Sequence, residues 1–168
     1  KFEGYENMFF VWEWRGYATK QYCVAQISDV PEVVELCARF HKESWQVFAD
    51  FDYDKMTSWI VEKVRNEEDQ IFLAKKHGEV IGVLIGMIFS FPYSNTLVGG
   101  DYIWYVVPQE RGGIAGVRLM KMFEAWAKDN GAVRIMTGAT SGIASNRAAR
   151  LMMRLGFEPM GSFMQKEI

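Results

Sequence analysis

The stretch VVPQERGGIAGVRLMKMFEAWAKDNGA (residues 106–132) decides which fold this chain can adopt. The run that leads into it, DYIWYVV (101–107), is rich in aromatic and β-branched residues, which favour a half-buried strand. Pro108 then ends strand pairing, because it lacks a backbone N–H. Apolar residues between positions 115 and 126 recur with the 3.6-residue period of an amphipathic helix, and Asn130 is a typical ending residue. The stretch therefore predicts a strand, a glycine-rich turn and a long helix.

The turn carries Gly112, Gly113 and Gly116 around the expected start of the helix, with Arg111 just before them. The first turn of a helix leaves backbone N–H groups unpaired and carries partial positive charge, so small residues there let a phosphate reach the backbone. Arg111 would add a charged donor at the same place. The glycines equally suit a strand-to-helix connection in which they serve only backbone geometry. The stretch has neither the Lys-Ser/Thr pair of a P-loop nor the spacing of a GxGxxG motif, which excludes both nucleotide-binding motifs.

The rest of the chain predicts a single α/β (α+β) domain with a mixed, mostly antiparallel twisted sheet and helices on both faces. A helix connects the strand at 101–107 to the apolar run AVRIMTGA (132–139), so these two strands are parallel and ligand sites lie at their carboxyl ends. The other expected strands are 21–27, two strands of a hairpin within 70–91 and a closing strand or hairpin at 157–168; helices are expected at 28–43, 54–66 and 145–157, and a loop at 92–100.

Length and composition are those of an ordinary globular protein. The 168 residues suffice for one domain with a substantial core, and 49% of them are hydrophobic and 24% charged. The net charge of -2 and the even spread of the 19 basic residues argue against a nucleic-acid partner. No run of 18 uncharged apolar residues occurs, which argues against a membrane partner.

The sequence gives no indication of a metal site. The chain has only two histidines, and Cys23 and Cys37 lack the spacing of metal ligands. We expect both cysteines to be buried free thiols, the state favoured in a reducing compartment, and hence a cytoplasmic protein.

The first 20 residues, KFEGYENMFFVWEWRGYATK, are unusually aromatic and precede the expected domain at 21–168. We expect an N-terminal extension or arm there. Two roles remain open for it. An arm would join the subunits of a homodimer or form a wall of a substrate site, whereas an extension would bury its large apolar side chains against its own domain.

The glycine-rich turn and the end of the chain are similar to segments of a known family. VVPQERGGIAGVRLM resembles the acyl-coenzyme A signature of the GNAT superfamily of N-acetyltransferases, V-x-P-x-x-R-G-x-G-x-G/A-x-x-L-L, with Ile114 in place of the middle glycine. SNRAARLMMRLGF is similar to the closing GNAT segment N-x-x-A-x-x-L-Y-x-x-x-G-F, with Ser145 in place of the asparagine and Met152 in place of the tyrosine. The resemblance covers about 22–168. The signature residues that fall in register are Val106, Pro108, Arg111, Gly112, Gly116, Leu119 and Met120.

This resemblance implies an acyltransferase that moves the acetyl group of acetyl-coenzyme A (acetyl-CoA) to a primary amine by direct attack in a ternary complex. Acetyl-CoA would be a co-substrate, and the acceptor would be a small-molecule, peptide or protein amine. By analogy with the family, the strand end offers backbone groups to the thioester and the turn holds the pyrophosphate. The implied cofactor-binding residues are Val106, Val107, Arg111, Gly112, Gly113, Ile114, Ala115, Gly116, Ser145 and Asn146.

Such a reaction needs a base, because an amine with a pKa of ~10.4 arrives protonated at neutral pH. The family often uses an acidic residue on or near the strand, and Asp101 and Glu110 are the candidates here. Aromatic neighbours would raise the pKa of a buried Asp101 into a useful range, although a solvated strand-end carboxylate is an equally open interpretation. The family tyrosine protonates the leaving sulfur, which Met152 cannot do. The candidate replacements are water, Tyr93, Tyr102 and Tyr105.

The first helix, expected at 28–43, and the loop after it border the acceptor site in the family. By that analogy His41, Glu43, Trp45, Phe51 and Tyr53 face the acceptor, although core packing and solvation explain the same residue types. A second function remains open as well: a catalytically weak or inactive domain that binds coenzyme A or a partner protein. Ile114 and Met152 favour that alternative, because both depart from the family pattern.

Overall fold

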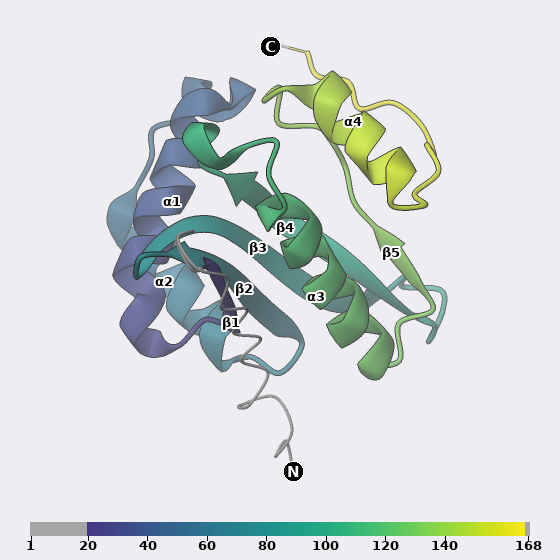
Figure 1. Cartoon of the computed structure of the whole chain (residues 1–168). Helices are drawn as coiled ribbons and strands as arrows, with labels where there is room; N and C mark the ends of the chain where they lie inside the picture. The colour runs from purple at the N-terminus through teal and green to yellow at the C-terminus, as the bar shows by residue number, and fades with distance from the viewer. Residues whose placement is uncertain (1–19, 167–168) are drawn as a thin grey trace.

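The structure, a computed structural model, describes residues 20–166. At its centre is a five-stranded sheet in the order β1-β2-β3-β4-β5, in which neighbouring strands are antiparallel except for β4 and β5 (Figure 1). This confirms the expected mixed sheet with one parallel pair. The arm expected at 1–20 lies outside the described residues, apart from Lys20. The strands are β1 (Lys20–Val24), β2 (Asp69–Lys76), β3 (Glu79–Ser90), β4 (Leu97–Val106) and β5 (Arg134–Met136).

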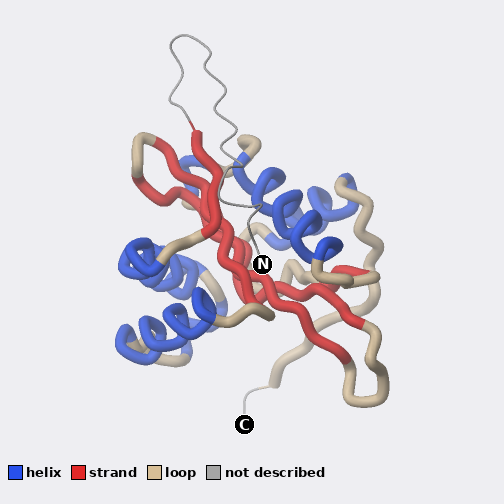
Figure 2. The backbone as a smooth tube through the Cα atoms, turned by 90° about the horizontal axis from the view of Figure 1, so that it is seen from below, coloured by secondary structure: helices blue, strands red, loops and turns tan. Residues whose placement is uncertain are grey.

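Helices lie on both sides of the sheet, as predicted (Figure 2). The first two helices pack against each other and against β2 and β3. The third packs closely on β3, where a Cβ on Gly86 would lie 2.6 Å from the ring of Phe123. Glycine at this position therefore sets how near the helix can come. The helices are α1 (Val30–Glu43), α2 (Tyr53–Arg65), α3 (Ala115–Asp129) and α4 (Ser145–Arg154), and short 3-10 turns span η1 (Ile27–Asp29), η2 (Trp45–Phe48) and η3 (Pro108–Glu110).

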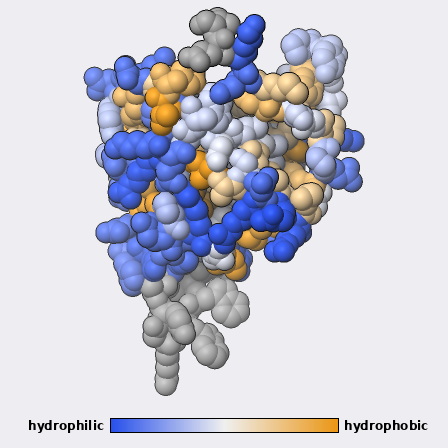
Figure 3. Space-filling model, turned by 90° about the horizontal axis from the view of Figure 1, so that it is seen from above, coloured by the Kyte–Doolittle hydropathy of each residue, from blue (hydrophilic) through white to orange (hydrophobic). Residues whose placement is uncertain are grey.

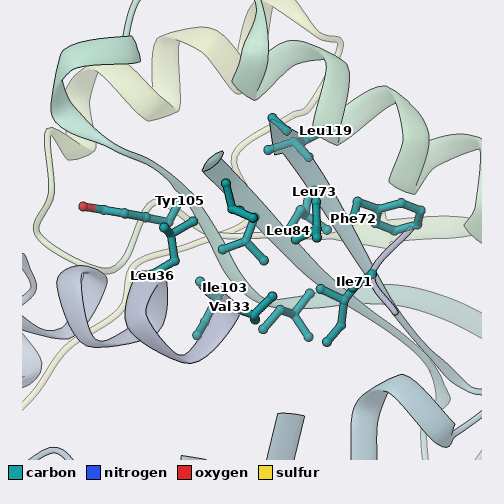
Figure 4. Packing of buried hydrophobic residues seen from close by; sticks show 14 of the residues in the cluster. Val33, Leu36, Ile71, Phe72, Leu73, Leu84, Ile103, Tyr105 and Leu119 are labelled. Carbon is teal, nitrogen blue, oxygen red and sulfur yellow. The ribbon is translucent and has the colours of Figure 1, made fainter. Parts of the chain in front are cut away.

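The core fills both sides of the sheet with aliphatic side chains. Val33 of α1 and Leu84 of β3 are fully buried, and so is Leu119 of α3 (Figure 4). Each fully buried side chain of this kind contributes about 1.5–3 kcal/mol to folding. This packing fixes β4, which borders the functional site, between α1 and α3.

A β-bulge in β4 decides which way Asp101 faces. Ile103 pairs with Ile85 of β3, but the next residue along β3, Gly86, pairs with Asp101, so Tyr102 is the extra residue. Bulges of this kind change the direction of the side chains on one side of the irregularity. Without it, Asp101 would share a face with Ile103 in the core. With it, Asp101 shares the α3 side of the sheet with Trp104, whose indole contacts Gly116.

The parallel pairing of β4 and β5 is short. It runs only from Val98 with Arg134 to Gly100 with Met136, so the second half of β4 has no partner on that side. Strand β5 is therefore much shorter than the strand expected at 132–139, because the chain leaves the sheet edge after Met136. The two strands diverge, and the backbone of β4 from Asp101 onward faces the space between them.

Two other sequence expectations need correction. The loop expected at 92–100 is shorter, because β4 already begins at Leu97 and pairs with Ser90. The closing strand expected at 157–168 is wrong for the residues that are described: 157–166 forms no helix or strand. Pro159 and Gly161 interrupt this segment, and its apolar side chains Met160 and Phe163 are 82% and 69% exposed.

Candidate active site

A cavity of about 610 Å³ opens where β4 and β5 diverge. This volume lies within the range of pockets that bind small molecules and cofactors, ~300–1,000 Å³. Four segments surround it: the end of β4, the turn before α3, the loop that follows β5 and one face of α4 (Figure 1). The predicted site residues that line it are Asp101, Tyr105, Val106, Arg111, Gly112, Gly113 and Gly116.

Some backbone groups at the end of β4 are hydrogen-bonded to the neighbouring strand β3. The N–H of Val107 donates to Ile81 of β3 at 2.9 Å, and Val107 is 7% exposed. Since peptide groups alternate in direction along a strand, those of Val106 point the other way, toward the cavity. The Val106 carbonyl accepts from Arg111 Nε at 2.8 Å. Of the backbone donors expected for a thioester, Val106 is therefore placed to serve, and Val107 is not.

The turn before α3 brings a glycine, a positive side chain and a helix start together. Gly112 adopts φ +87°, and a Cβ added there would collide with the guanidinium of Arg147 from α4. Only glycine leaves room for a group at this position. The helix that begins at Ala115 directs its unpaired N–H groups to the same place. The turn and Arg147 therefore form a cradle in which a positive side chain already lies.

Arg147 is a charged residue of the cavity that sequence reasoning missed. Along α4, residues 144, 147, 148 and 151 share one face by helical spacing and line the cavity. The predicted residues Ser145 and Asn146 are absent from the lining. A helical-face argument applied to α4 would have favoured Arg147, because it combines the right face with a charge suited to phosphate.

Arg111, the charged residue of the signature, is engaged elsewhere. Its Nη2 lies 2.7 Å from Glu43 Oε2 at the end of α1, and its guanidinium lies 5.2 Å from the centre of the Tyr105 ring. The Tyr105 hydroxyl donates to the same Glu43 carboxylate. Burial and this hydrogen bond raise the pKa of Tyr105 above its ordinary value. The three side chains form a cluster that ties α1 to β4 and to the turn.

Asp101 and Glu110, the two candidate bases, have pKa values shifted in opposite directions. Burial raises the pKa of Asp101 to about 6, although the neighbouring Thr137 hydroxyl partly opposes the rise. Glu110 accepts from Lys20 at 2.8 Å and from Lys76 at 2.5 Å. These hydrogen bonds lower its pKa to about 2. Asp101 therefore suits proton transfer near neutral pH, and Glu110 does not.

The position of the family tyrosine offers no proton donor. Met152 is 7% exposed and lines the cavity. Among the candidate replacements, Tyr93 is 84% exposed, stacks on Phe91 and is absent from the lining. Tyr102 and Tyr105 do line the cavity, although the hydroxyl of Tyr105 is already committed to Glu43.

Two residues of the predicted turn contribute no side chain to the cavity. Ile114 is 51% exposed and stands outside the lining, so the residue that replaces the middle glycine does not block the cavity. Ala115, the first residue of α3, is fully buried in the core. Both could serve a ligand only through their backbone at the start of the helix.

The expected acceptor residues are divided between two places. Trp45 of η2 reaches the cavity wall: its Nε1 donates to the Thr140 carbonyl at 2.5 Å and its backbone N–H to Ser141 at 3.1 Å. His41 instead hydrogen-bonds the Ala49 carbonyl and packs on Phe51, away from the lining. Tyr53 packs on Phe51 in the same outer cluster. Phe40 and Gln46 line the cavity, which no sequence pattern indicated.

Within residues 20–166, no group of His, Cys, Asp and Glu side chains is arranged to hold a metal ion. None of the helices in that range has the length and apolar character that a membrane crossing requires. Cys37 is buried and Cys23 half-buried, and neither forms a disulfide.

A layered α/β domain with a glycine turn at a helix start beside two diverging parallel strands is an arrangement in which proteins commonly bind phosphate-bearing ligands. Residues 30–157 match the sequence model of the Acetyltransferase (GNAT) family, and the chain is a member of this family. A comparison with curated proteins finds no significant match.

Solved structures agree with this fold. An acetyltransferase of Trypanosoma brucei is 17% identical, with a TM-score of 0.68 over 89% of this chain and 99% of that one. The aminoglycoside N-acetyltransferase AAC(6')-Iy in complex with CoA is 13% identical, with a TM-score of 0.75 over 93% and 99%. A predicted acetyltransferase of Clostridium acetobutylicum with acetyl-CoA is 16% identical, with a TM-score of 0.70 over 88% and 96%.

Proposed function

We propose that this protein transfers the acetyl group of acetyl-CoA to a primary amine by direct attack in a ternary complex. The observation that carries this proposal is one cavity with two chemically different ends. One end holds Asp101, a carboxylate whose pKa burial raises to about 6. The other end holds the glycine turn with the Arg147 guanidinium over Gly112.

The residues present fit a pyrophosphate. Since a Cβ at Gly112 would collide with the Arg147 guanidinium, glycine lets this positive group lie against the turn, and the start of α3 adds backbone donors for an anion. Arg147 supplies the positive charge, and Gly113 and Gly116 keep the approach open. Val106 would donate its N–H to the thioester oxygen, where negative charge develops. Acetyl-CoA itself supplies an activated acetyl thioester.

Asp101 would accept the proton of the incoming ammonium. An amine pKa of ~10.4 lies about 4 units above that of Asp101, so the transfer costs roughly 6 kcal/mol in water. Burial of the ammonium in the cavity lowers its own pKa and reduces this cost. The neutral nitrogen then bonds to the acetyl carbon as the carbon–sulfur bond breaks, and coenzyme A leaves as a thiolate. The nitrogen loses its second proton to water, water protonates the thiolate, and Asp101 returns its own proton to solvent.

The lack of a tyrosine at Met152 affects the rate more than the route. A general acid typically contributes ~10²- to 10⁴-fold, but a thiol with a pKa of ~8.5 can leave without one. The same residue supports the alternative function, a slow or inactive domain that binds coenzyme A. Amine-dependent turnover separates the two, because a binding domain shows none.

The test measures thiol release from acetyl-CoA with and without amines, using Asp101→Asn and a control. We expect Asp101→Asn to lower amine-dependent kcat by ~10²- to 10⁴-fold, the range for a lost general base. Asp54→Asn, an equally conservative change at an exposed carboxylate of α2, should leave it unaltered. Equal activity of both variants would remove Asp101 from the mechanism.

A further inference from the structure

The cavity offers one uncommitted negative charge to an acceptor. Two carboxylates line it within the described residues, Asp101 and Glu110. Glu110 is neutralised by Lys20 and Lys76 at 2.8 and 2.5 Å. Glu43, which touches the lining, is occupied by Arg111 and Tyr105. Asp101 is left to face an ammonium group.

The other charges of the cavity are positive. Apart from Arg111, which is paired with Glu43, three arginines line it: Arg147, Arg150 and Arg154. Phosphates of coenzyme A would neutralise part of this charge, but they add no carboxylate to the acceptor end. An acceptor with several ammonium groups would find one partner and then like charges, which costs affinity. The electrostatics therefore select an acceptor with a single positive charge.

Three aromatic side chains cluster beside the cavity, and two of them are exposed. Trp45 and Phe48 of η2 stack with their ring centres 5.8 Å apart and their planes 9° apart, and Phe48 is 79% exposed. Phe163, from the segment after α4, lies 6.3 Å from Trp45 and is 69% exposed. We call Trp45, Phe48 and Phe163 the aromatic rim.

The aromatic rim adjoins the cavity directly. Gln46, between Trp45 and Phe48 in the chain, lines the cavity, and so do Thr140 and Ser141, to which Trp45 is hydrogen-bonded. Figure 3 looks down on this end of the molecule and shows apolar and weakly polar residues between strongly hydrophilic ones. Exposed apolar clusters with a polar border commonly mark binding surfaces, and flat aromatic faces suit other rings.

We infer that the acceptor is a primary monoamine carried on an aromatic or extended apolar group, and that polycationic amines are poor acceptors. This inference rests on the proposed acetyltransferase function and names its substrate class. The single ammonium meets Asp101, and the apolar part lies on the aromatic rim. The chain would thus differ in acceptor from the aminoglycoside acetyltransferases that share its fold.

The experiment measures kcat/KM by thiol release for 2-phenylethylamine, ethylamine and spermidine at saturating acetyl-CoA. We expect the order 2-phenylethylamine, ethylamine, spermidine. Phe48→Ala should lower the ratio of kcat/KM for 2-phenylethylamine to that for ethylamine about three- to tenfold, the loss of one aromatic contact. Phe48→Tyr should retain the ratio, because it keeps the ring.

Tyr93→Ala is the matched control. Tyr93 is 84% exposed and stacks on Phe91 with planes 3° apart, as Phe48 does on Trp45, but it does not line the cavity. A Phe48→Ala variant whose ratio equals that of Tyr93→Ala would overturn the inference, and so would a kcat/KM for spermidine above that for 2-phenylethylamine. Thiol release with a lysine peptide but with none of these amines would overturn the acceptor class alone. Thiol release with no amine of either kind would reject the acetyltransferase function itself.

Discussion

The two helix starts that face the cavity, before α3 and before α4, differ in how they relate to the family pattern. The turn before α3 keeps the signature arginine, yet Arg111 is bound to Glu43 and to the Val106 carbonyl. The start of α4 has Ser145 in place of the family asparagine, yet its Arg147 reaches over Gly112. In this chain the signature provides the backbone shape, and a residue outside the signature provides the free charge.

The largest effect is expected from a substitution in the turn before α3. Gly112→Ala should weaken coenzyme A binding by at least ~10-fold, because the new Cβ displaces the charge of Arg147 from the cradle and also narrows the turn that would hold the pyrophosphate. The measurement is isothermal titration with coenzyme A.

Gly78→Ala supplies the control for backbone strain. Gly78 has φ +88°, almost that of Gly112, but nothing lies within 4 Å of its added Cβ. Both variants should lose ~1–2 kcal/mol of stability from the left-handed conformation, and only Gly112→Ala should lose affinity. Equal affinity of the two variants would show that the cradle at Gly112 has no part in binding.

The next largest effect is expected from replacing Arg147 of α4. Arg147→Ala should weaken coenzyme A binding about fivefold to tenfold, the lower part of the range for charge-assisted contacts because Arg147 is exposed. Arg111→Ala should weaken it less and lower Tm more, since Arg111 ties α1 to β4. The affinity for pantetheine, which lacks the pyrophosphate, should be the same in wild type and Arg147→Ala. An affinity loss confined to Arg111→Ala would restore the signature arginine as the phosphate ligand.

The smallest effect concerns the missing glycine of the signature. Ile114→Gly should change coenzyme A affinity by less than ~2-fold, because the Ile114 side chain stands outside the cavity and glycine is tolerated at a helix N-cap. A large gain in affinity would mean that Ile114 restricts the turn after all.

The sequence predicted the fold where local patterns determine it. The strand, turn and helix around 101–130 are confirmed, because glycine spacing and helical periodicity are local properties. The length of β5 was missed, since it depends on how long the chain stays at the sheet edge. The predicted closing strand or hairpin does not form, because residues 157–166 pair with no strand of the described residues.

The candidate site was predicted only in part, because local patterns do not show how distant segments meet. Asp101 was found from its neighbours, but the bulge at Tyr102 that turns it toward the cavity has no marker residue. The bond between Glu43 and Tyr105 joins positions 62 residues apart, which no spacing rule reveals. Arg147 lay within a recognised segment, yet the family pattern directed attention to its neighbours Ser145 and Asn146.

The most direct test of the proposed function is the pH dependence of kcat/KM for amine-dependent thiol release from acetyl-CoA. Asp101 must be ionised to accept a proton, so activity should be full well above its pKa and fall as the pH drops through about 6. Asp101→Asn should leave only slow turnover without this acidic limb. An unchanged limb near pH 6 and full activity in Asp101→Asn would contradict the assignment of Asp101 as the base.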